Sequence, residues 1–178
     1  MEQKILLSDK AFQITVQRLC HQLIENHQHF ENTVIIGIQP RGSFLAKRIC
    51  DELQNITGYK IKLGLLDVTF YRDDFRTHDK PLIPSSNQID FIVENKKVVL
   101  IDDVLYTGRT IRSALDALID LGRPEKVELL VLIDRRFTRD LPIQPDYTGK
   151  KVDTINSQKV KVSWKETENE DKVYLINN

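Results

Sequence analysis

The sequence has few cysteines, no excess of either charge and no long apolar run, and each absence removes a class of protein. Its 178 residues include two cysteines, Cys20 and Cys50, too few for a disulfide framework or a cysteine-rich zinc site. Lys plus Arg and Asp plus Glu both count 26, so wholesale nucleic-acid binding is not indicated, although a local basic patch stays open. No apolar stretch approaches a membrane span, and no signal segment follows the first residues. We therefore expect a cytoplasmic protein with reduced thiols.

What the sequence does contain is an alternation of apolar strands and amphipathic helices. Ser8 is the predicted N-cap of a helix over residues 9–26, and the apolar block 34–38 predicts a strand buried on both faces. Further strands are expected at about 60–69, 97–103 and 128–133, and further helices at about 43–54 and 110–121. Strands that alternate with helices of this length predict an α/β fold with a mostly parallel central sheet.

We expect one domain over residues 1–178 with two irregular parts. Residues 71–90 are polar and contain prolines and serines, and a long structureless segment in a compact domain is usually functional. This segment is predicted to be a flexible lid, with a simple surface excursion as the alternative. Residues 134–178 show short β-type alternation and are expected to form a small C-terminal hood over the carboxyl edge of the sheet, where open α/β sheets place their ligands.

The segment 98–110 carries the main functional signal. Its buried strand ends in Asp102 and Asp103, and the turn 106–110 then opens a helix. Such a turn directs backbone N–H groups and hydroxyls toward one anion at a helix N-terminus, and Gly108 lets the backbone approach that anion closely. Two acids would repel a second phosphate but can accept hydrogen bonds from sugar hydroxyls. The segment therefore predicts a ribose 5-phosphate site.

Other phosphate and metal sites fit this segment less well. The glycine spacing and the lysine of a Walker A loop are absent, and a single glycine is no dinucleotide fingerprint. Two carboxylates after a strand can also bind a metal, as in a Walker B motif or a phosphatase. No lysine partner for a phosphatase nucleophile can be assigned, however. A purely structural strand–turn–helix is the simplest alternative.

The same segment resembles the signature of type I phosphoribosyltransferases, which is an apolar strand, two acids and Thr-Gly-x-Thr. Longer pieces are similar to one branch of that family, the bifunctional pyrimidine-operon attenuation regulators and uracil phosphoribosyltransferases. These pieces follow one another along nearly the whole chain, at 37–42, 45–48, 71–74, 102–110, 116–118, 122–124, 134–135, 141–143 and 146–150. The resemblance implies the type I phosphoribosyltransferase fold and an enzyme that converts uracil and phosphoribosyl pyrophosphate to UMP and pyrophosphate.

The resemblance also implies a role for each matching residue. Asp102, Asp103 and Arg72 would form the catalytic set, with the two acids on the ribose hydroxyls and Arg72 on the lid. The remaining predicted contacts are Tyr106, Thr107, Gly108, Arg109 and Thr110 for the 5-phosphate, Pro40, Arg41 and Gly42 for pyrophosphate, and Asp134, Arg135, Tyr147 and Thr148 for the base. A non-proline cis peptide is expected between Pro40 and Arg41. Mg²⁺ would be held mainly by the substrate, without a dedicated protein site.

Relatives in this branch also bind a hairpin in the leader of pyrimidine mRNA when a uridine nucleotide is bound, and they assemble as dimers and tetramers. The candidate RNA contacts are Arg18, His21 and Gln22, which share one helix face, together with Lys150, Lys151 and Lys159. Two departures fall in the segment associated with RNA contact. Arg136-Phe137 replaces the family's Gly-His, and Gln144-Pro145 replaces Arg-Ala.

Four functional alternatives therefore stay open from the sequence. The chain could be an enzyme with RNA binding, a nucleotide-sensing RNA regulator without turnover, or a purely metabolic phosphoribosyltransferase. It could also be a purine enzyme, but purine-using relatives tend to have lysine where Asp134 stands, to meet a purine carbonyl. An acid at this position speaks against hypoxanthine or guanine.

Overall fold

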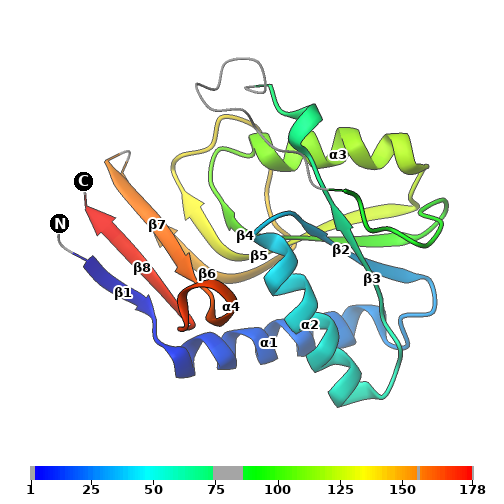
Figure 1. Cartoon of the computed structure of the whole chain (residues 1–178), viewed down its shortest axis with the longest axis horizontal. Coiled ribbons are helices and arrows are strands. Elements are labelled where there is room, and N and C mark those ends of the chain that lie inside the picture. Colours follow the sequence, from blue (N-terminus) through cyan, green and yellow to red (C-terminus); the bar gives the residue numbers. More distant parts are fainter. Residues whose placement is uncertain (1–2, 74–85, 156, 178) are drawn as a thin grey trace.

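The fold was taken from a computed structural model in which residues 3–73, 86–155 and 157–177 are described (Figure 1). Its central sheet has five strands in the order β3-β2-β4-β5-β6, and every neighbouring pair is parallel. The bounds are β2 (Thr33–Ile38), β3 (Lys62–Leu66), β4 (Lys97–Leu105), β5 (Lys126–Arg136) and β6 (Tyr147–Asp153). The predicted α/β architecture with a mostly parallel sheet is confirmed.

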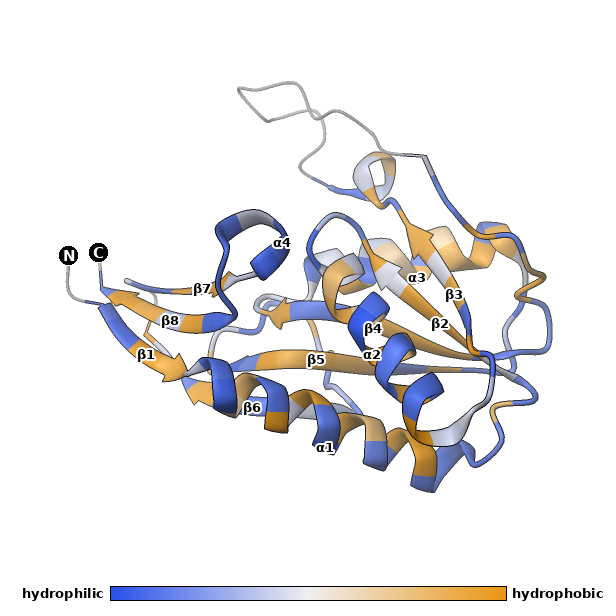
Figure 2. Ribbon diagram, turned by 60° about the horizontal axis from the view of Figure 1, so that its bottom comes forward, coloured by the Kyte–Doolittle hydropathy of each residue, from blue (hydrophilic) through white to orange (hydrophobic). Residues whose placement is uncertain are grey.

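Three helices cover this sheet. Helices α1 (Asp9–His27) and α2 (Gly42–Thr57) pack on one face, and α3 (Arg109–Leu121) packs on the other, so that each face has its own apolar core. Figure 2 shows mostly apolar strands between helices with hydrophilic stretches. Ser8 caps α1 as predicted, because its hydroxyl accepts the Ala11 N–H at 3.4 Å. Among the described residues, no helix has the length and apolar character that a membrane crossing requires.

A second sheet forms the hood. It has three antiparallel strands in the order β1-β8-β7, with bounds β1 (Gln3–Leu7), β7 (Gln158–Ser163) and β8 (Lys172–Asn177), and the short helix α4 (Lys165–Glu168) lies between β7 and β8 in the chain. The two described ends of the chain therefore pair side by side (Figure 1).

The hood boundaries predicted at 134–178 were wrong in two respects. Strand β6 belongs to the central sheet, and β1, from the other end of the chain, belongs to the hood. Both are the outermost strands of their sheets: β6 pairs with β5 and β1 pairs with β8. Short-range periodicity cannot show which sheet a strand will join, because the pairing depends on residues far apart in the chain.

Strand ends also differ from the sequence-based bounds. The strand expected at 60–69 ends at Leu66, because the Asp67 carboxylate accepts the Thr69 N–H at 2.8 Å and a 3₁₀ turn, η1 (Thr69–Tyr71), begins. Strands β4 and β5 run further than expected because they pair with each other up to Leu105 and Asp134. Of the predicted lid at 71–90, residues 74–85 lie outside the described part of the chain, and Gln88 forms an isolated bridge with Leu65.

Candidate active site

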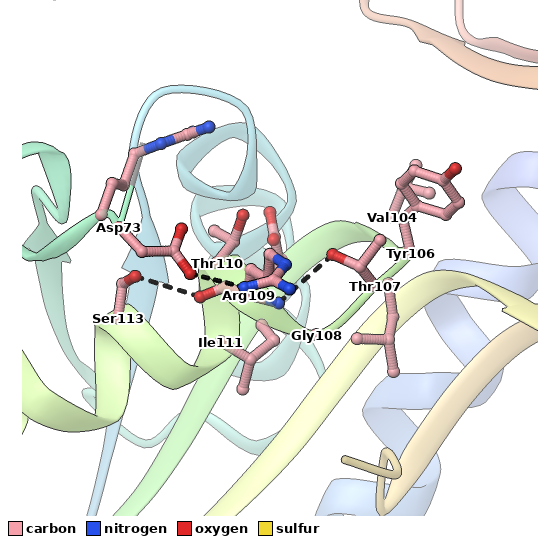
Figure 3. Close-up of a pocket in the computed structure, with 12 residues that line it drawn as sticks. Asp73, Val104, Tyr106, Thr107, Gly108, Arg109, Thr110, Ile111 and Ser113 are labelled. Carbon is pink, nitrogen blue, oxygen red and sulfur yellow. Dashed lines mark hydrogen bonds and ion pairs between the residues drawn. The ribbon is translucent and has the colours of Figure 1, made fainter. Parts of the chain in front are cut away.

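The predicted phosphate-binding turn lies at the carboxyl end of β4, where α3 begins at Arg109. It lines a cavity of about 250 Å³ together with Arg72, Asp73 and Asp102 (Figure 3). The cavity thus brings together the turn, one of the two acids and the described start of the predicted lid. All five residues predicted to hold the 5-phosphate, from Tyr106 to Thr110, line it.

The conformation of the turn depends on glycine. Gly108 has a φ of +92°, and a Cβ at this position would lie 3.2 Å from Ile143 Cδ1. Gly108 is also the N-cap of α3, so the N-cap residue has no side chain to cap the N–H groups of the first helical turn. The Thr107 hydroxyl accepts a hydrogen bond from the Arg109 backbone N–H at 3.4 Å. This geometry leaves a helix N-terminus with hydroxyls beside it, which suits a phosphate.

Arg109 is held at the mouth of the cavity by two carboxylates. Its Nη1 lies 2.7 Å from Asp73 and its Nε lies 3.0 Å from Asp140. Figure 3 shows Asp73 directed toward the Arg109 side chain. Asp73 follows Arg72, so this ion pair joins the described start of the predicted lid to the predicted phosphate-binding turn.

The acidic pair is buried beside the turn. Asp102 and Asp103 are each 8% exposed, and the Asp102 carboxylate accepts the Asp103 N–H at 2.9 Å. Burial raises the pKa of Asp102 well above its ordinary value, and the neighbouring charge of Asp103 raises it further. Burial also raises the pKa of Asp103, although the Arg41 guanidinium partly opposes this. Two crowded carboxylates of this kind favour a ligand that brings hydroxyl donors or positive charge.

The predicted pyrophosphate loop lies directly against this pair. Arg41 donates from Nε to the Asp103 carboxylate at 3.1 Å. The same guanidinium bonds the Val162 carbonyl of β7 and lies 3.7 Å from Glu168 of α4. A Cβ on Gly42 would lie 2.6 Å from the Ile101 carbonyl oxygen, so glycine is required where the loop meets the end of β4. Arg41 therefore connects the loop, the acids and the hood.

One prediction about this loop was wrong. The cis peptide lies between Gln39 and Pro40, one bond before the predicted position between Pro40 and Arg41. The difference follows ordinary peptide chemistry, since a bond before proline has only a small preference for trans and a non-proline bond has a large one.

Asp134 and Arg135 lie beside the turn, at the end of β5. The Arg135 guanidinium lies 3.9 Å from the centre of the Tyr106 ring and donates to the Thr154 hydroxyl at 3.1 Å. It also donates to the Gln158 carbonyl of β7 at 2.9 Å, which brings the hood to the same place. Asp134 is buried and pairs with Arg139.

The placement of Tyr147 contradicts its predicted role in covering the base. Tyr147 pairs with Leu130 at the start of β6, whereas Lys151 is the residue that lies opposite Asp134. The Tyr147 ring is buried, and its hydroxyl bonds Glu128 at 3.2 Å, at the amino end of the sheet. Because β6 runs parallel to β5, its first residues lie away from the carboxyl edge, where the turn is. Thr148, the next residue, pairs with Val131 and lies only one residue nearer to that edge.

The structure brings together two of the candidate RNA contacts. Arg18 of α1 donates to the Thr148 carbonyl of β6 at 3.3 Å and also bonds the carbonyl of Gly149, so it lies next to Lys150. Lys150 donates to the Leu6 carbonyl at 2.8 Å. The side chains of both cations are exposed.

The other RNA candidates are less uniform. The exposed ones are His21, Lys151 and Lys159. Lys151 lies opposite Asp134 in the register of β6 against β5, and Lys159 lies on β7 of the hood. Gln22 has a buried Oε1 with no hydrogen-bond partner among the described residues. Gln22 is therefore less available at the surface than helical spacing suggested.

The contributors to the site that were missed from the sequence include Arg139, the Val162 carbonyl and Glu168. Each reaches the site from the segment after β5 or from the hood, through contacts between residues far apart in the chain. No local pattern marks these contacts. The two side chains meet partners far away in the sequence, and a backbone carbonyl in a strand has no sequence signature.

Comparisons with known proteins agree with this geometry. The family model described as "Phosphoribosyl transferase domain" matches residues 2–167. Proteins named "Bifunctional protein PyrR" are 41% identical in Bacillus mycoides (strain KBAB4) and 42% identical in Bacillus cereus (strain AH820), in each case over 98% of this chain and 97% of the relative.

Solved structures agree on the fold. The hypoxanthine phosphoribosyltransferase of Trypanosoma cruzi superposes with a TM-score of 0.74 at 15% identity, over 98% of this chain and 96% of that one. A hypoxanthine phosphoribosyltransferase from Staphylococcus aureus gives 0.72 at 20% identity, over 98% and 92%. The fold is that of the type I phosphoribosyltransferases, and with the full-length sequence similarity it follows that this chain belongs to the PyrR branch of that family.

Proposed function

We propose that the chain is a uracil phosphoribosyltransferase, which joins uracil to phosphoribosyl pyrophosphate and releases UMP and pyrophosphate. One observation carries the proposal: the phosphate-binding turn, the buried acids and Arg41 meet at the same edge of the sheet. This arrangement offers a separate place for the 5-phosphate, the ribose hydroxyls and the pyrophosphate. Membership in the PyrR branch supports a pyrimidine as the base.

The chain's own residues would act by positioning and by charge. In the reaction the bond from C1 to pyrophosphate breaks and the bond from C1 to the base nitrogen forms, through a cation-like ribose, while that nitrogen loses its proton. The turn at 106–110 would fix the 5-phosphate, and Asp102 and Asp103 would hold the ribose hydroxyls. The negative charge of the two acids would then stabilise the positive charge that develops on the sugar. No protein nucleophile is required.

The donor set at the site fits a magnesium ion that arrives with its substrate. Among the residues described, no group of three or more His, Cys, Asp or Glu side chains could hold a metal. The protein therefore offers the two carboxylates of Asp102 and Asp103, and substrate oxygens and water would supply the rest, as Mg²⁺ usually prefers. When bound, Mg²⁺ would neutralise charge on the pyrophosphate.

We place the base between the ends of β4 and β5 and the hood strand β7. Arg41 reaches the Val162 carbonyl, and Arg135 reaches the Gln158 carbonyl, so β7 lies over this part of the edge. Backbone groups of a strand can read the edge of a flat ring through hydrogen bonds. Asp134 and Arg135 would border this pocket, and Tyr147 would not take part.

The deciding experiment measures pyrophosphate release from phosphoribosyl pyrophosphate with Mg²⁺, with uracil, with hypoxanthine and without a base. We expect release that depends on uracil. Release with hypoxanthine alone would make the chain a purine enzyme. No release with any base, in a chain that binds UMP tightly, would make it a nucleotide-sensing regulator instead.

A second function, RNA binding controlled by UMP, is favoured by the adjacency of Arg18 and Lys150 on α1 and β6. Two adjacent cations can neutralise neighbouring phosphates of an RNA hairpin from the leader of pyrimidine mRNA. A gel shift with and without UMP tests this, with Arg18→Ala and Lys150→Ala expected to weaken binding. Lys62→Ala is the matched control, because Lys62 is an exposed cation on β3, the opposite edge strand.

Two further expectations belong to this proposal. The free thiols of Cys20 and Cys50 are buried, and burial raises the pKa of each to about 12, which suits a reducing cytoplasm. The chain is expected to assemble as a dimer or tetramer, which light scattering on the purified protein would test.

A further inference from the structure

Arg139 has an unusual set of partners at the carboxyl edge of the sheet. Its Nη2 bonds the Asp134 carboxylate, and its Nη1 bonds the carbonyl of Tyr106. The same Nη1 lies 3.4 Å from the Leu105 carbonyl and 3.3 Å from the Arg135 carbonyl. One guanidinium thus joins the last residues of β4, where the phosphate-binding turn begins, to the last residues of β5.

The residues after Arg139 continue this contact along the turn. The N–H groups of Asp140 and Leu141 donate to the Thr107 carbonyl at 3.0 and 3.2 Å. The Asp140 carboxylate pairs with Arg109, and Ile143 packs against Gly108. The turn therefore rests on the segment 139–143, and Arg139 is the anchor of that segment at the end of the sheet.

The ion pair with Arg139 gives Asp134 a different role from the predicted contact with the base. The Asp134 side chain is 8% exposed, and its charge is balanced by Arg139 at hydrogen-bond distance. A buried carboxylate engaged in this way costs free energy if its partner is removed. An acid that must hold a guanidinium in place is poorly suited to reading a base as well.

We propose that Arg139 is a positioning residue for the 5-phosphate turn and that Asp134 is its counter-ion rather than a reader of the base. The inference rests on the proposed function, because it assigns roles within the same site. It predicts that both residues govern affinity for sugar phosphates and leave affinity for uracil nearly unchanged. It also predicts that Asp134→Lys would not create a purine site, since the new lysine would face Arg139.

The test compares Arg139→Met, Arg139→Lys and Asp134→Asn with the unaltered chain. Calorimetry with ribose 5-phosphate reports the sugar-phosphate site without requiring turnover, and steady-state kinetics give KM for phosphoribosyl pyrophosphate and for uracil separately. Arg136→Met is the matched control, because Arg136 is an exposed neighbour that pairs with Asp153 at the surface. Thermal unfolding of each variant shows that it is folded.

We expect Arg139→Met and Asp134→Asn each to weaken ribose 5-phosphate binding about 10-fold and to raise KM for phosphoribosyl pyrophosphate similarly, with KM for uracil changed less than about 2-fold. Arg139→Lys should lose about 3-fold, since an ammonium cannot serve all four acceptors. The double variant Asp134→Asn/Arg139→Met should be little worse than either single one.

Two results would overturn the inference while leaving the proposed function intact. One is unchanged ribose 5-phosphate binding in a folded Arg139→Met or Arg139→Lys variant. The other is an Asp134→Asn variant whose KM for uracil rises while its ribose 5-phosphate affinity does not change, because Asp134 would then read the base. If the unaltered chain bound no ribose 5-phosphate, the inference and the proposed function would fall together.

Discussion

The two ends of the central sheet both bury ionisable side chains, but they treat those side chains differently. At the carboxyl end, Asp102 and Asp103 lie side by side, and Arg41 is the cation that partly balances them. At the amino end, Glu128 Oε2 lies 2.7 Å from His27 Nε2, and burial lowers the pKa of His27. The two acids at the carboxyl end share Arg41 as a cation, whereas Glu128 at the amino end has several polar partners within the protein.

Every member of the amino-end network has partners. Glu128 accepts from Lys126 at 2.6 Å and from the Tyr147 hydroxyl at 3.2 Å, and that hydroxyl accepts from the Asn26 amide at 3.1 Å. His27 Nδ1 lies 3.0 Å from the Thr33 hydroxyl. Such a satisfied network stabilises one arrangement of α1, β5 and β6.

The pKa shifts follow this difference. Burial alone would raise the pKa of Glu128, but Lys126 and His27 lower it below its ordinary value. Burial raises the pKa of Tyr147 to about 12, with a contribution from the charge of Glu128. The pKa of both acids at the carboxyl end is raised. A raised carboxyl pKa marks a group that the fold itself does not satisfy, which is typical of ligand sites.

The largest effect is expected from removing the charge of both acids at the carboxyl end. The double variant Asp102→Asn/Asp103→Asn should lower kcat/KM on the order of 1000-fold, because the sugar cation loses its stabilising charge. The free energy of unfolding should rise by about 1 kcal/mol, since two crowded buried charges are gone. Steady-state kinetics and urea unfolding measure both. A variant that is less stable than the parent would show that the acids serve the fold.

The next effect concerns the turn itself. Thr107→Ala with Thr110→Ala should weaken binding of phosphoribosyl pyrophosphate on the order of 100-fold, as two hydroxyl contacts to a charged phosphate are lost. The folded stability should change little, because both threonines lie at the cavity. Calorimetry with the substrate checks this. Near-normal affinity in the double variant would contradict the placement of the 5-phosphate.

At the amino end the expected effect is on stability alone. Glu128→Gln should lower the free energy of unfolding by about 2 kcal/mol, because an amide cannot accept from His27, Lys126 and Tyr147 together. The value of kcat should stay within about 2-fold of the parent, since this network lies at the opposite end of the sheet. A large loss of kcat in the folded variant would mean that the two ends are coupled.

The two ends should also respond oppositely to pH. The pKa of His27 is lowered from 6.5 by burial, so the unfolded chain takes up the proton first and stability falls as the pH drops below about 6.5. The lowered pKa of Glu128 adds a further loss below about 4.5. The raised pKa of Asp102 has the opposite effect on stability. Its contribution to the free energy of unfolding is present below about pH 3.8 and is lost as the pH rises through the raised pKa.

Urea unfolding across pH separates these contributions. The double variant Asp102→Asn/Asp103→Asn should no longer lose stability as the pH rises, but it should still lose stability at acid pH. Glu128→Gln should remove the loss of stability below about pH 4.5 and deepen the loss that begins below about 6.5, because the Glu128 charge supports protonation of His27. The rising-pH side should stay unaltered. If both variants changed the same limb, the assignment of the two ends would be wrong.

The smallest effect is expected from Tyr147→Phe, which removes one hydroxyl from the amino-end network. The free energy of unfolding should fall by about 1 kcal/mol, because Glu128 and Asn26 each lose a partner. KM for uracil should not change, since the ring lies away from the carboxyl edge. A several-fold rise in KM for uracil would restore Tyr147 to the base pocket.

Residues that act through neighbours in sequence were predicted well. The turn at 106–110 and the acids before it form one strand–turn–helix, and the structure places the turn and Asp102 at one cavity. The limits of α1 and α3 followed from Ser8 and Gly122. Local spacing did not place Tyr147 or Arg139. The pairing of β6 with β5 sets the position of Tyr147, and contacts with the ends of β4 and β5 set that of Arg139.

The sequence by itself determined the local elements, the phosphate-binding turn and the family, because each depends on residues within a few positions or on motifs in fixed order. Only the tertiary structure decided which strand covers which edge, where the hood begins, and which buried charges serve the fold. The physical reason is that edge pairing and charge compensation join residues distant in sequence, such as Arg41 with Val162 and His27 with Glu128. Their partners are set by packing of the whole chain rather than by any local pattern.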